Sequence, residues 1–406
     1  MKVYTSKHEL VIIQDSPLAS GGEGEIREVI STPERFKNVC AKLYYQRGRS
    51  DQQKQKIKYM AENPPKEVTG EGFMIGWPLD YLTDGNRQFL GFLMPLAFGN
   101  SIQLINLTST RLPKTLGSEW YYRYDRGNGV SALLSRLKLI NNISIPVYLL
   151  HATKKYVMKD FKPENVLVTA TGKISMVDMD SIQIVDDGKL LFPGNAATPN
   201  YIPPEYYTKG VGRSSSDILN KSWDEFAIGI VFYQLLFGLH PYVVTPSKIT
   251  DDSSNDISQH ISENLFPFGN NASKIASYPP LHDKFKILPD NLQALFTRAF
   301  SNAASNRPSA SIWGRTVHDI ILAAPKPPPP TISGPQVPVN NAGKGTSTPT
   351  GPKESPSQPK PSTPPQSPSS NSSTSNPPDP KNTSWIITVV LIAIVAFIAL
   401  MIAMFY

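Results

Sequence analysis

Four side chains in two nearby stretches of the sequence have the types and the spacing of a site for phosphoryl transfer. They are Asp160, Lys162, Asn165 and Asp178. This reaction leaves little covalent chemistry to the protein. Its site needs a carboxylate that orients the attacking hydroxyl group, together with an Asn and an Asp that hold metal on the phosphates. The pattern therefore predicts transfer of a phosphoryl group from ATP bound to a divalent cation.

The residues around these side chains resemble the catalytic loop and the metal-binding turn of eukaryotic-type protein kinases, with two departures. Residues 158–160 read Met-Lys-Asp where the family usually has His-Arg-Asp. Residues 178–180 read Asp-Met-Asp where the family usually has Asp-Phe-Gly. A side chain at Asp180 disfavours the positive φ angle that glycine allows, so we expect it to hold the turn in one conformation.

The resemblance implies a role for each of the four side chains. Asp160 and Lys162 are the expected catalytic residues: Asp160 orients the hydroxyl group of the substrate, and Lys162 neutralises charge on the transferring phosphoryl group. Asn165 and Asp178 are the expected metal ligands, for Mg2+ or alternatively Mn2+. A lysine at position 162 is typical of the Ser/Thr branch of the family, so the expected substrates are Ser and Thr hydroxyl groups of proteins.

A glycine-rich loop near the N-terminus is the first of the family's other parts. It follows a strand-like run at 8–14, and Ala19 takes the place of its first glycine. Glycine lets backbone N–H groups approach phosphates closely, although such a sequence also forms ordinary hairpin turns. A strand-like segment then ends at Lys42. By the resemblance this lysine binds the α- and β-phosphates, whereas an isolated strand-end lysine is usually a surface charge.

The adenine of ATP is expected to bind to the backbone of residues 92–96, which follow a strand-like run at 88–92. Cys40 takes the small apolar position that lines the adenine pocket, where its modification would block ATP. Its alternative role is that of a small core residue. The residues predicted to contact ATP are Lys42, Ala19, Ser20, Gly21, Gly22, Glu23, Gly24, Ile26, Cys40, Met94 and Leu96.

Three later segments appear in the order that the family has. Residues 197–205 resemble the end of an activation segment, and residues 223–238 resemble the buried helix that crosses the large lobe. By the resemblance, Asp224 at the start of this helix braces the backbone of the catalytic loop. Arg307 is expected to form a structural ion pair with Glu205.

These matches extend from about residue 10 to about residue 320, so the expected fold is the α+β, bilobal protein-kinase fold. The predicted kinase domain covers residues 1–324. It has a small antiparallel-sheet lobe at about 1–95 and a large helical lobe at about 96–324. This length exceeds the usual range of a single domain and fits two lobes that share a cleft.

The C-terminal part of the chain has a different composition. Almost half of the 38 prolines fall between residues 325 and 380, so residues 325–384 are predicted to form a disordered linker. Residues 385–406 carry no charged side chain and are long enough to cross a lipid bilayer, which predicts a single transmembrane helix. A buried core helix is the alternative, but beyond such a linker it would have nothing nearby to pack on.

The N-terminus lacks the pattern of a signal peptide, so we expect a single-pass, tail-anchored membrane protein with a cytoplasmic kinase domain. The one cysteine fits a reducing compartment. The net charge of +7 is spread along the chain, which predicts weak attraction to membrane surfaces and no binding to nucleic acid. The motifs together resemble a divergent, microbial branch of the family. Such kinases often act beside a metal-dependent Ser/Thr phosphatase, an expected partner here, and no pattern indicates an oligomeric state.

Two other functions compete with that of an active kinase. A pseudokinase that binds nucleotide or partners is suggested by the departures in the two motifs and by the lack of an obvious acidic partner for Lys42. Glu62, just before Asn-Pro-Pro at 63–65, is the candidate for that partner, and a surface charge is its alternative role. An adaptor that acts through the proline-rich segment 325–384 is the second alternative.

The activation segment, residues 178–205, offers few sites for regulation by phosphorylation. Its hydroxyl groups belong to Ser181, Thr198 and Tyr201. Lys159 replaces the arginine that commonly binds a phosphorylated activation loop in the family. We therefore predict that phosphorylation of this segment is not the switch that activates the protein.

Overall fold

The computed structural model describes residues 1–195, 197–247 and 256–324. The predicted linker at 325–384 and the predicted transmembrane helix at 385–406 lie outside the described residues. In the part of the chain that the structure describes, no helix is both long enough and apolar enough to cross a membrane.

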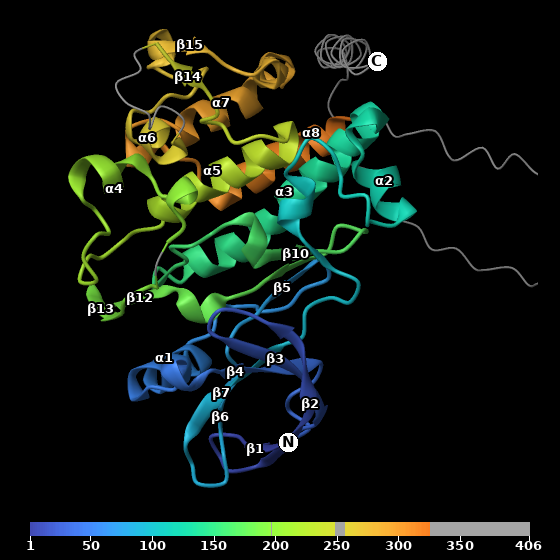
Figure 1. Ribbon diagram of the computed structural model, residues 1–406, viewed down its shortest axis with the longest axis vertical. Coiled ribbons are helices and arrows are strands. Elements are labelled where there is room, and N and C mark those ends of the chain that lie inside the picture. Colours follow the sequence, from blue (N-terminus) through green and yellow to red (C-terminus); the bar gives the residue numbers. More distant parts are fainter. Residues whose placement is uncertain (196, 248–255, 325–406) are drawn as a thin grey trace, which may run out of the picture. The chain divides into compact units, whose positions relative to one another are not determined.

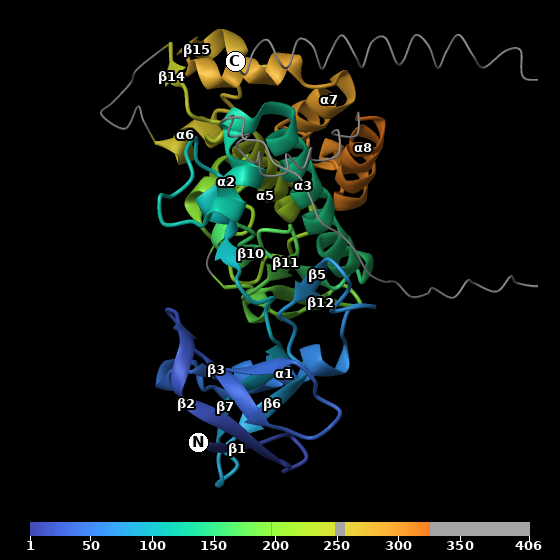
Figure 2. The ribbon, with the colours of Figure 1, turned by 90° about the vertical axis from the view of Figure 1, so that its right-hand side faces the viewer.

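The N-terminal part forms a closed six-stranded barrel in the order β1-β2-β3-β4-β7-β6, and every pair in it is antiparallel (Figures 1 and 2). Its strands are β1 (Lys2–Tyr4), β2 (Leu10–Ser20), β3 (Gly24–Ser31), β4 (Val39–Tyr44), β6 (Asp80–Thr83) and β7 (Phe89–Pro95). Side chains of a strand alternate between its two faces, so Val11 and Ile13 of β2 point into the core while their neighbours do not. Ala41 and Leu93 meet them there.

Helix α1 (Asp51–Glu62) lies between β4 and β5 (Phe73–Ile75) in the chain. The side chain of Ser50 accepts a hydrogen bond from the N–H of Gln53, which caps the first turn of α1. The helix ends at Asn63 because two prolines follow. It buries Lys56, Ile57 and Met60, so its buried face carries a positive charge.

The remaining part is built around helices. The helices are α2 (Ser118–Tyr124), α3 (Gly129–Ala152), α4 (Pro204–Lys209), α5 (Ser222–Phe237), α6 (Ile257–Ser262), α7 (Asp290–Ala299) and α8 (Ala310–Ala323). The 3-10 helices of the described chain are η1 (Gln46–Gly48), which lies between β4 and α1, and, in the helical part, η2 (Leu104–Leu107), η3 (Arg126–Asn128), η4 (Pro163–Asn165), η5 (Met179–Ser181), η6 (Pro199–Tyr201), η7 (Ala272–Lys274), η8 (Pro280–Ile287) and η9 (Ala304–Asn306). Figures 1 and 2 both show α3, α5 and α8 side by side.

Helix α5 is buried on all sides, as expected of a helix that is apolar around its whole circumference. A β-carbon on Gly229 would lie 2.8 Å from that of Ala299, so a glycine at this position lets α5 and α7 approach closely. The ring of Tyr233 contacts several other aromatic rings. They are Phe237, Phe266, Phe285, Phe296 and Phe300. The predicted core helix at 223–238 is therefore confirmed, and Gly238 ends it with a φ of 80°.

Three small sheets complete the helical part. Strands β5, β11 (Ile174–Met176), β10 (Val166–Val168) and β8 (Ile102–Gln103) form the first sheet. Strands β13 (Lys189–Phe192), β12 (Gln183–Asp186) and β9 (Tyr156–Val157) form the second, and β14 (Thr245–Pro246) pairs with β15 (Ile275–Ser277). Because β5 comes between α1 and the barrel strand β6 but pairs in parallel with β11, it joins the two parts of the described chain.

The predicted ion pair between Glu205 and Arg307 is confirmed. Both terminal nitrogens of Arg307 donate to the carboxylate of Glu205, each at 2.7 Å. The arginine side chain is fully buried, and it also donates to the carbonyl oxygen of Ser222 and lies over the ring of Phe226. The pair therefore ties the end of the activation segment to α5 and to the segment before α8.

The buried pair gives the first testable prediction. Glu205→Gln leaves the buried guanidinium of Arg307 without its counter-charge, so we expect the free energy of unfolding to fall by about 3 to 5 kcal/mol. Chemical denaturation measures this change. Asp283→Asn is the control, because it removes an exposed pair with Lys286 of the same 2.7 Å length and should leave the midpoint unchanged. Equal effects of the two substitutions would contradict the prediction.

Candidate active site

The catalytic loop is fixed from below by Asp224, as the resemblance implied. Its two carboxylate oxygens accept the N–H groups of Met158 at 2.8 Å and Lys159 at 3.0 Å. His151 lies 3.0 Å from the same carboxylate, and the indole of Trp223 donates to the carbonyl oxygen of Lys159. Lys159 has a φ of 63°, which is unfavourable for a side chain of this kind, so these bonds offset a backbone cost.

Asp160 is held by a small network of charged and polar side chains. Lys162 donates to one of its carboxylate oxygens at 2.6 Å. Thr198 donates to the other oxygen twice, from its N–H at 2.9 Å and from its hydroxyl group at 2.7 Å. Lys162 also donates to the Thr198 hydroxyl group at 2.9 Å, so the three side chains close a ring. The sequence prediction assigned Asp160 and Lys162 but missed Thr198, since only the fold brings it to them.

A β-hairpin brings the two predicted metal ligands together. Asn165 immediately precedes β10, and Asp178 follows two residues after the end of β11. The antiparallel pairing places Val166 opposite Met176, and the N–H of Val177 donates to the carbonyl oxygen of Asn165 at 2.9 Å. The amide nitrogen of Asn165 donates to the carbonyl oxygen of Asp160 at 3.0 Å, which directs its amide oxygen away from that loop.

A cavity of about 570 Å³ lies beside these residues. Its walls include Asn165, Asp178 and Leu167 on one side and the glycine-rich loop on the other. All the residues predicted to contact ATP line it. They are Ala19, Ser20, Gly21, Gly22, Glu23, Gly24, Ile26, Cys40, Lys42, Met94 and Leu96. Asp160 and Lys162 are not in its wall, but Asp160 is connected to it through Asn165.

Two glycines of the loop differ in how much space surrounds them. A β-carbon on Gly24 would lie 2.2 Å from the carbonyl oxygen of Leu43, so Gly24 is needed for the pairing of β3 with β4. A β-carbon on Gly22 would meet no atom within 4 Å. Gly22 therefore leaves space above the cavity, which fits the close approach of a phosphate to the backbone.

Cys40 contributes to the cavity wall from β4, but its side chain is almost fully buried. Burial raises the pKa of the Cys40 thiol to about 12. Modification of a cysteine requires the thiolate, which is scarce at such a pKa. The structure therefore favours the core role of Cys40 over that of a reactive group in the nucleotide pocket.

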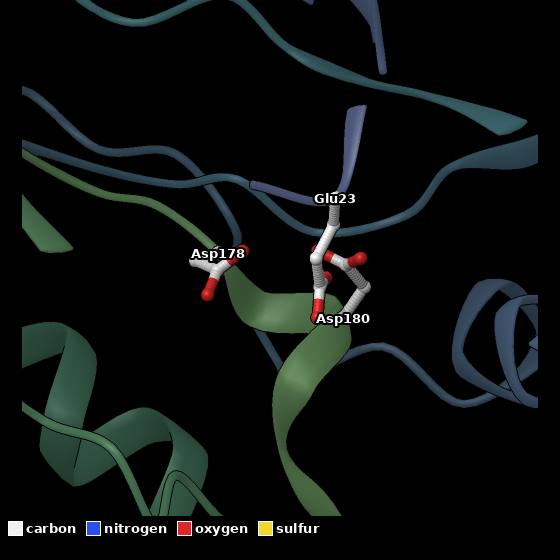
Figure 3. A group of neighbouring side chains, drawn as sticks. All are labelled: Glu23, Asp178 and Asp180. Carbon is white, nitrogen blue, oxygen red and sulfur yellow. The ribbon is translucent and has the colours of Figure 1, made fainter. Parts of the chain in front are cut away.

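Lys42 lies among three carboxylates at the polar end of the cavity. Its ammonium group is 3.0 Å from Asp178, 2.7 Å from Asp180 and 3.8 Å from Glu23. Figure 3 shows Glu23 descending from the glycine-rich loop toward the two aspartates of the metal-binding turn. Burial opposes the charge of Lys42, but Asp180 and Asp178 outweigh this effect and raise its pKa. Lys42 therefore stays charged.

Asp180 is buried, and its carboxylate has two partners from β4. Lys42 donates to both of its oxygens, and the hydroxyl group of Tyr44 donates to one of them. Burial by itself would raise the pKa of Asp180, but Lys42 and Tyr44 reverse the effect and lower it. Asp180 is therefore ionised and fully paired, a role that the sequence prediction missed when it assigned this residue only an effect on backbone conformation.

Glu62, the candidate partner of Lys42, does not reach it. The side chain is exposed at the end of α1 and lies 4.0 Å from Lys58 of the same helix. Helix α1 instead directs Lys56 inward, and burial lowers the pKa of that lysine to about 8 although Asp180 opposes the shift. Its other predicted role, that of a surface charge, is confirmed, because distance along the chain fixes the helix but not the face on which a residue lies.

Hydrogen bonds hold the activation segment to the catalytic loop and to the glycine-rich loop. Lys159 donates to the carbonyl oxygen of Gly194 at 3.3 Å, and Asn195 donates to Glu23 of the glycine-rich loop at 3.0 Å. The three hydroxyl groups of the segment are all engaged. Ser181 donates to the carbonyl oxygen of Asp178, Thr198 to Asp160 and Tyr201 to Gln234.

The site has a suitable donor set for a divalent cation on phosphates. Asp178 uses one carboxylate oxygen for Lys42 and presents its side chain to the cavity. The amide oxygen of Asn165 accepts no hydrogen bond from the residues that the structure describes. Carboxylate and amide oxygens are the ligands that Mg2+ and Mn2+ accept, so Asn165 and Asp178 fit such an ion.

Comparison with known proteins agrees with this geometry. A family model described as a protein kinase domain matches residues 126–315, a segment that contains the catalytic loop, the metal-binding turn and α5. Protein kinase YegI of Escherichia coli (strain K12) is 25% identical over 321 residues, which cover 77% of this chain and 45% of that protein.

Two human proteins match shorter stretches. Serine/threonine-protein kinase tousled-like 2 is 32% identical over 123 residues, which cover 28% of this chain and 14% of that protein. Citron Rho-interacting kinase is 33% identical over 101 residues, which cover 23% of this chain and 5% of that protein. The chain thus spans less than half the length of each of these relatives. The family model and these relatives show that residues 126–315 of this chain are similar to a protein kinase domain, a type of domain that uses ATP and a divalent metal.

Proposed function

We propose that this protein is a kinase that transfers the γ-phosphoryl group of ATP to Ser and Thr hydroxyl groups of other proteins. One observation carries the proposal: Lys42 and Asp178 lie 3.0 Å apart at the end of a nucleotide-sized cavity, and Asn165 in its wall hydrogen-bonds to the loop of Asp160. When bound, ATP supplies the phosphoryl group and a divalent cation on its phosphates offsets their negative charge.

The chain's own residues position the acceptor. Asp160 accepts a hydrogen bond from the incoming hydroxyl group and directs its oxygen, and Thr198 keeps the carboxylate in one orientation. Lys162 places a positive charge beside Asp160, where it can offset the negative charge of the transferring phosphoryl group. Lys42 holds the phosphates, and Gly22 leaves room for the backbone of the loop to close over them.

The preference for Ser and Thr is supported by Lys162, whose position is typical of that branch in the family resemblance. The tousled-like relative is named a serine/threonine-protein kinase, which agrees with this preference. A pseudokinase is the weaker candidate, because the side chains expected for transfer are all present. They are Lys42, Asp160, Asn165 and Asp178. Lys42 hydrogen-bonds to Asp178, and Asn165 hydrogen-bonds to the backbone of Asp160. The adaptor function and the phosphatase partner are supported by the sequence alone.

Membrane attachment through residues 385–406 is a further part of the proposal. Its support is the apolar, uncharged sequence of that segment. The segment would hold the kinase domain on the cytoplasmic side of the bilayer, where ATP is available. The proline-rich residues 325–384 would then separate the domain from the membrane.

Transfer is tested with the full chain, labelled ATP, Mg2+ or Mn2+ and a generic basic protein acceptor. Asp160→Asn removes the carboxylate that orients the acceptor, and we expect kcat to fall by about 100-fold or more. Asp187→Asn is the matched control, since Asp187 is exposed in the turn between β12 and β13 and Asn tolerates its φ of 47°. Equal incorporation by wild type and Asp160→Asn would exclude the proposal, and phosphotyrosine as the only product would exclude Ser/Thr specificity.

The role of activation-segment phosphorylation is tested separately. Because its hydroxyl groups already hold structural hydrogen bonds, we expect the initial rate to be unchanged after treatment with a broad-specificity phosphatase. Mass spectrometry of the segment confirms that no phosphate remains, and a mock-treated sample is the control. A loss of activity that returns when phosphate is restored at Ser181 would contradict this prediction.

A further inference from the structure

Two aspartates of the metal-binding turn hold the ammonium group of Lys42. Lys42 donates to both oxygens of Asp180, at 2.7 and 2.8 Å, and to one oxygen of Asp178 at 3.0 Å. Both acids belong to the metal-binding turn, residues 178–180. A bond to both oxygens of one carboxylate fixes the direction of the ammonium group better than a single contact does.

Two further side chains support Asp180 in this position. Tyr44, two residues after Lys42 on β4, donates its hydroxyl group to Asp180. Gln53 of α1 donates to the same Tyr44 hydroxyl group at 2.7 Å. A chain of hydrogen bonds therefore runs from Gln53 of α1 through the Tyr44 hydroxyl group to Asp180, and its two donors are neutral.

Helix α1 offers no acid of its own to Lys42. Its acidic residues, Asp51 and Glu62, are exposed at its two ends. The charged side chain that it buries is Lys56, which has the same sign as Lys42. The negative charge beside Lys42 thus comes from the turn and from Glu23 of the glycine-rich loop, and the positive charge comes from the strand and the helix.

We propose that Asp180 is the residue that positions Lys42 to bind the phosphates of the nucleotide, in place of an acid from helix α1. The proposal rests on the proposed kinase function. Asp180 acts through Lys42 and is therefore a positioning residue. One segment, residues 178–180, then sets both the metal ligand Asp178 and the direction of the lysine.

In this arrangement the position of Lys42 requires no acid on α1. The helix is itself attached elsewhere: the hydroxyl group of Tyr59 donates to Asp186 of β12 at 2.5 Å, and Lys155 donates to the same carboxylate at 2.9 Å. Asn63, which follows the last residue of α1, accepts a bond from Lys155 at 3.3 Å. These contacts fix the C-terminal end of α1 without involving Lys42.

The test compares binding of ADP and of adenosine to the full chain in the presence of Mg2+. Asp180→Asn keeps the shape of the side chain and removes its charge. We expect it to weaken ADP binding by about 10-fold or more and to leave adenosine binding unchanged, because Lys42 contacts phosphates and not the nucleoside. Glu62→Gln is the matched control and should change neither affinity.

Two results would overturn the inference. ADP binding that is unchanged in a folded Asp180→Asn variant would show that Lys42 is positioned without this acid. Equal weakening of ADP and adenosine would show that Asp180 only supports the fold. Thermal unfolding establishes that the variant is folded. If it is not, Asp180→Ser, which also removes the carboxylate but leaves a hydroxyl group that can accept from Tyr44 and Lys42, replaces it in the same comparison and is judged by the same two results.

The outcome is separate from that of the transfer assay. Binding of ADP and adenosine does not require phosphoryl transfer, so these affinities decide the role of Asp180 even for a protein that transfers nothing. A wild-type chain that binds ADP but labels no acceptor would refute the proposed kinase activity alone.

Discussion

The arrangement of the site depends on the ion pairs between one buried lysine and the carboxylates around it. Lys42 comes from the barrel, and Asp178 and Asp180 come from the turn that follows β11. A buried charge without a partner is strongly destabilising, so the strand and the turn must stay together for either to be stable. The nucleotide cavity is the space that remains beside this pair, and its polar end is therefore fixed by the same contacts that hold the fold together.

In the catalytic loop, buried backbone N–H groups need partners in the same way that the buried charge of Lys42 does. A loop that carries Asp160 and Lys162 must leave regular secondary structure, which frees N–H groups that need acceptors. Asp224 accepts two of these groups from the start of α5, the most deeply buried helix of the described chain. The acid at the head of an apolar helix thus joins the hydrophobic core to the site, and core packing fixes where Asp160 lies.

The sequence predicts those parts of the site that depend on short stretches of chain. Asp160 and Asn165 lie in one loop, and a single hairpin brings Asp178 to them, so local patterns sufficed to group them. The acid that holds Lys42 was not predictable in this way. Position along the chain suggested Glu62, but the acid is Asp180, whose approach to β4 depends on how the barrel meets the turn. The contact of Thr198 with Asp160 was missed because it depends on the path of the activation segment over the catalytic loop.

The distribution of charge around Lys42 explains why an aspartate fits at position 180. With a lysine at position 56 facing inward, α1 adds positive charge to a region that already contains Lys42, and an acid must come from another element. The turn supplies it at the cost of the conformational freedom that glycine would give. A turn held in this way cannot move without breaking the pair with Lys42. The glycine-rich loop is tied to the activation segment by a separate contact, in which Asn195 donates a hydrogen bond to Glu23.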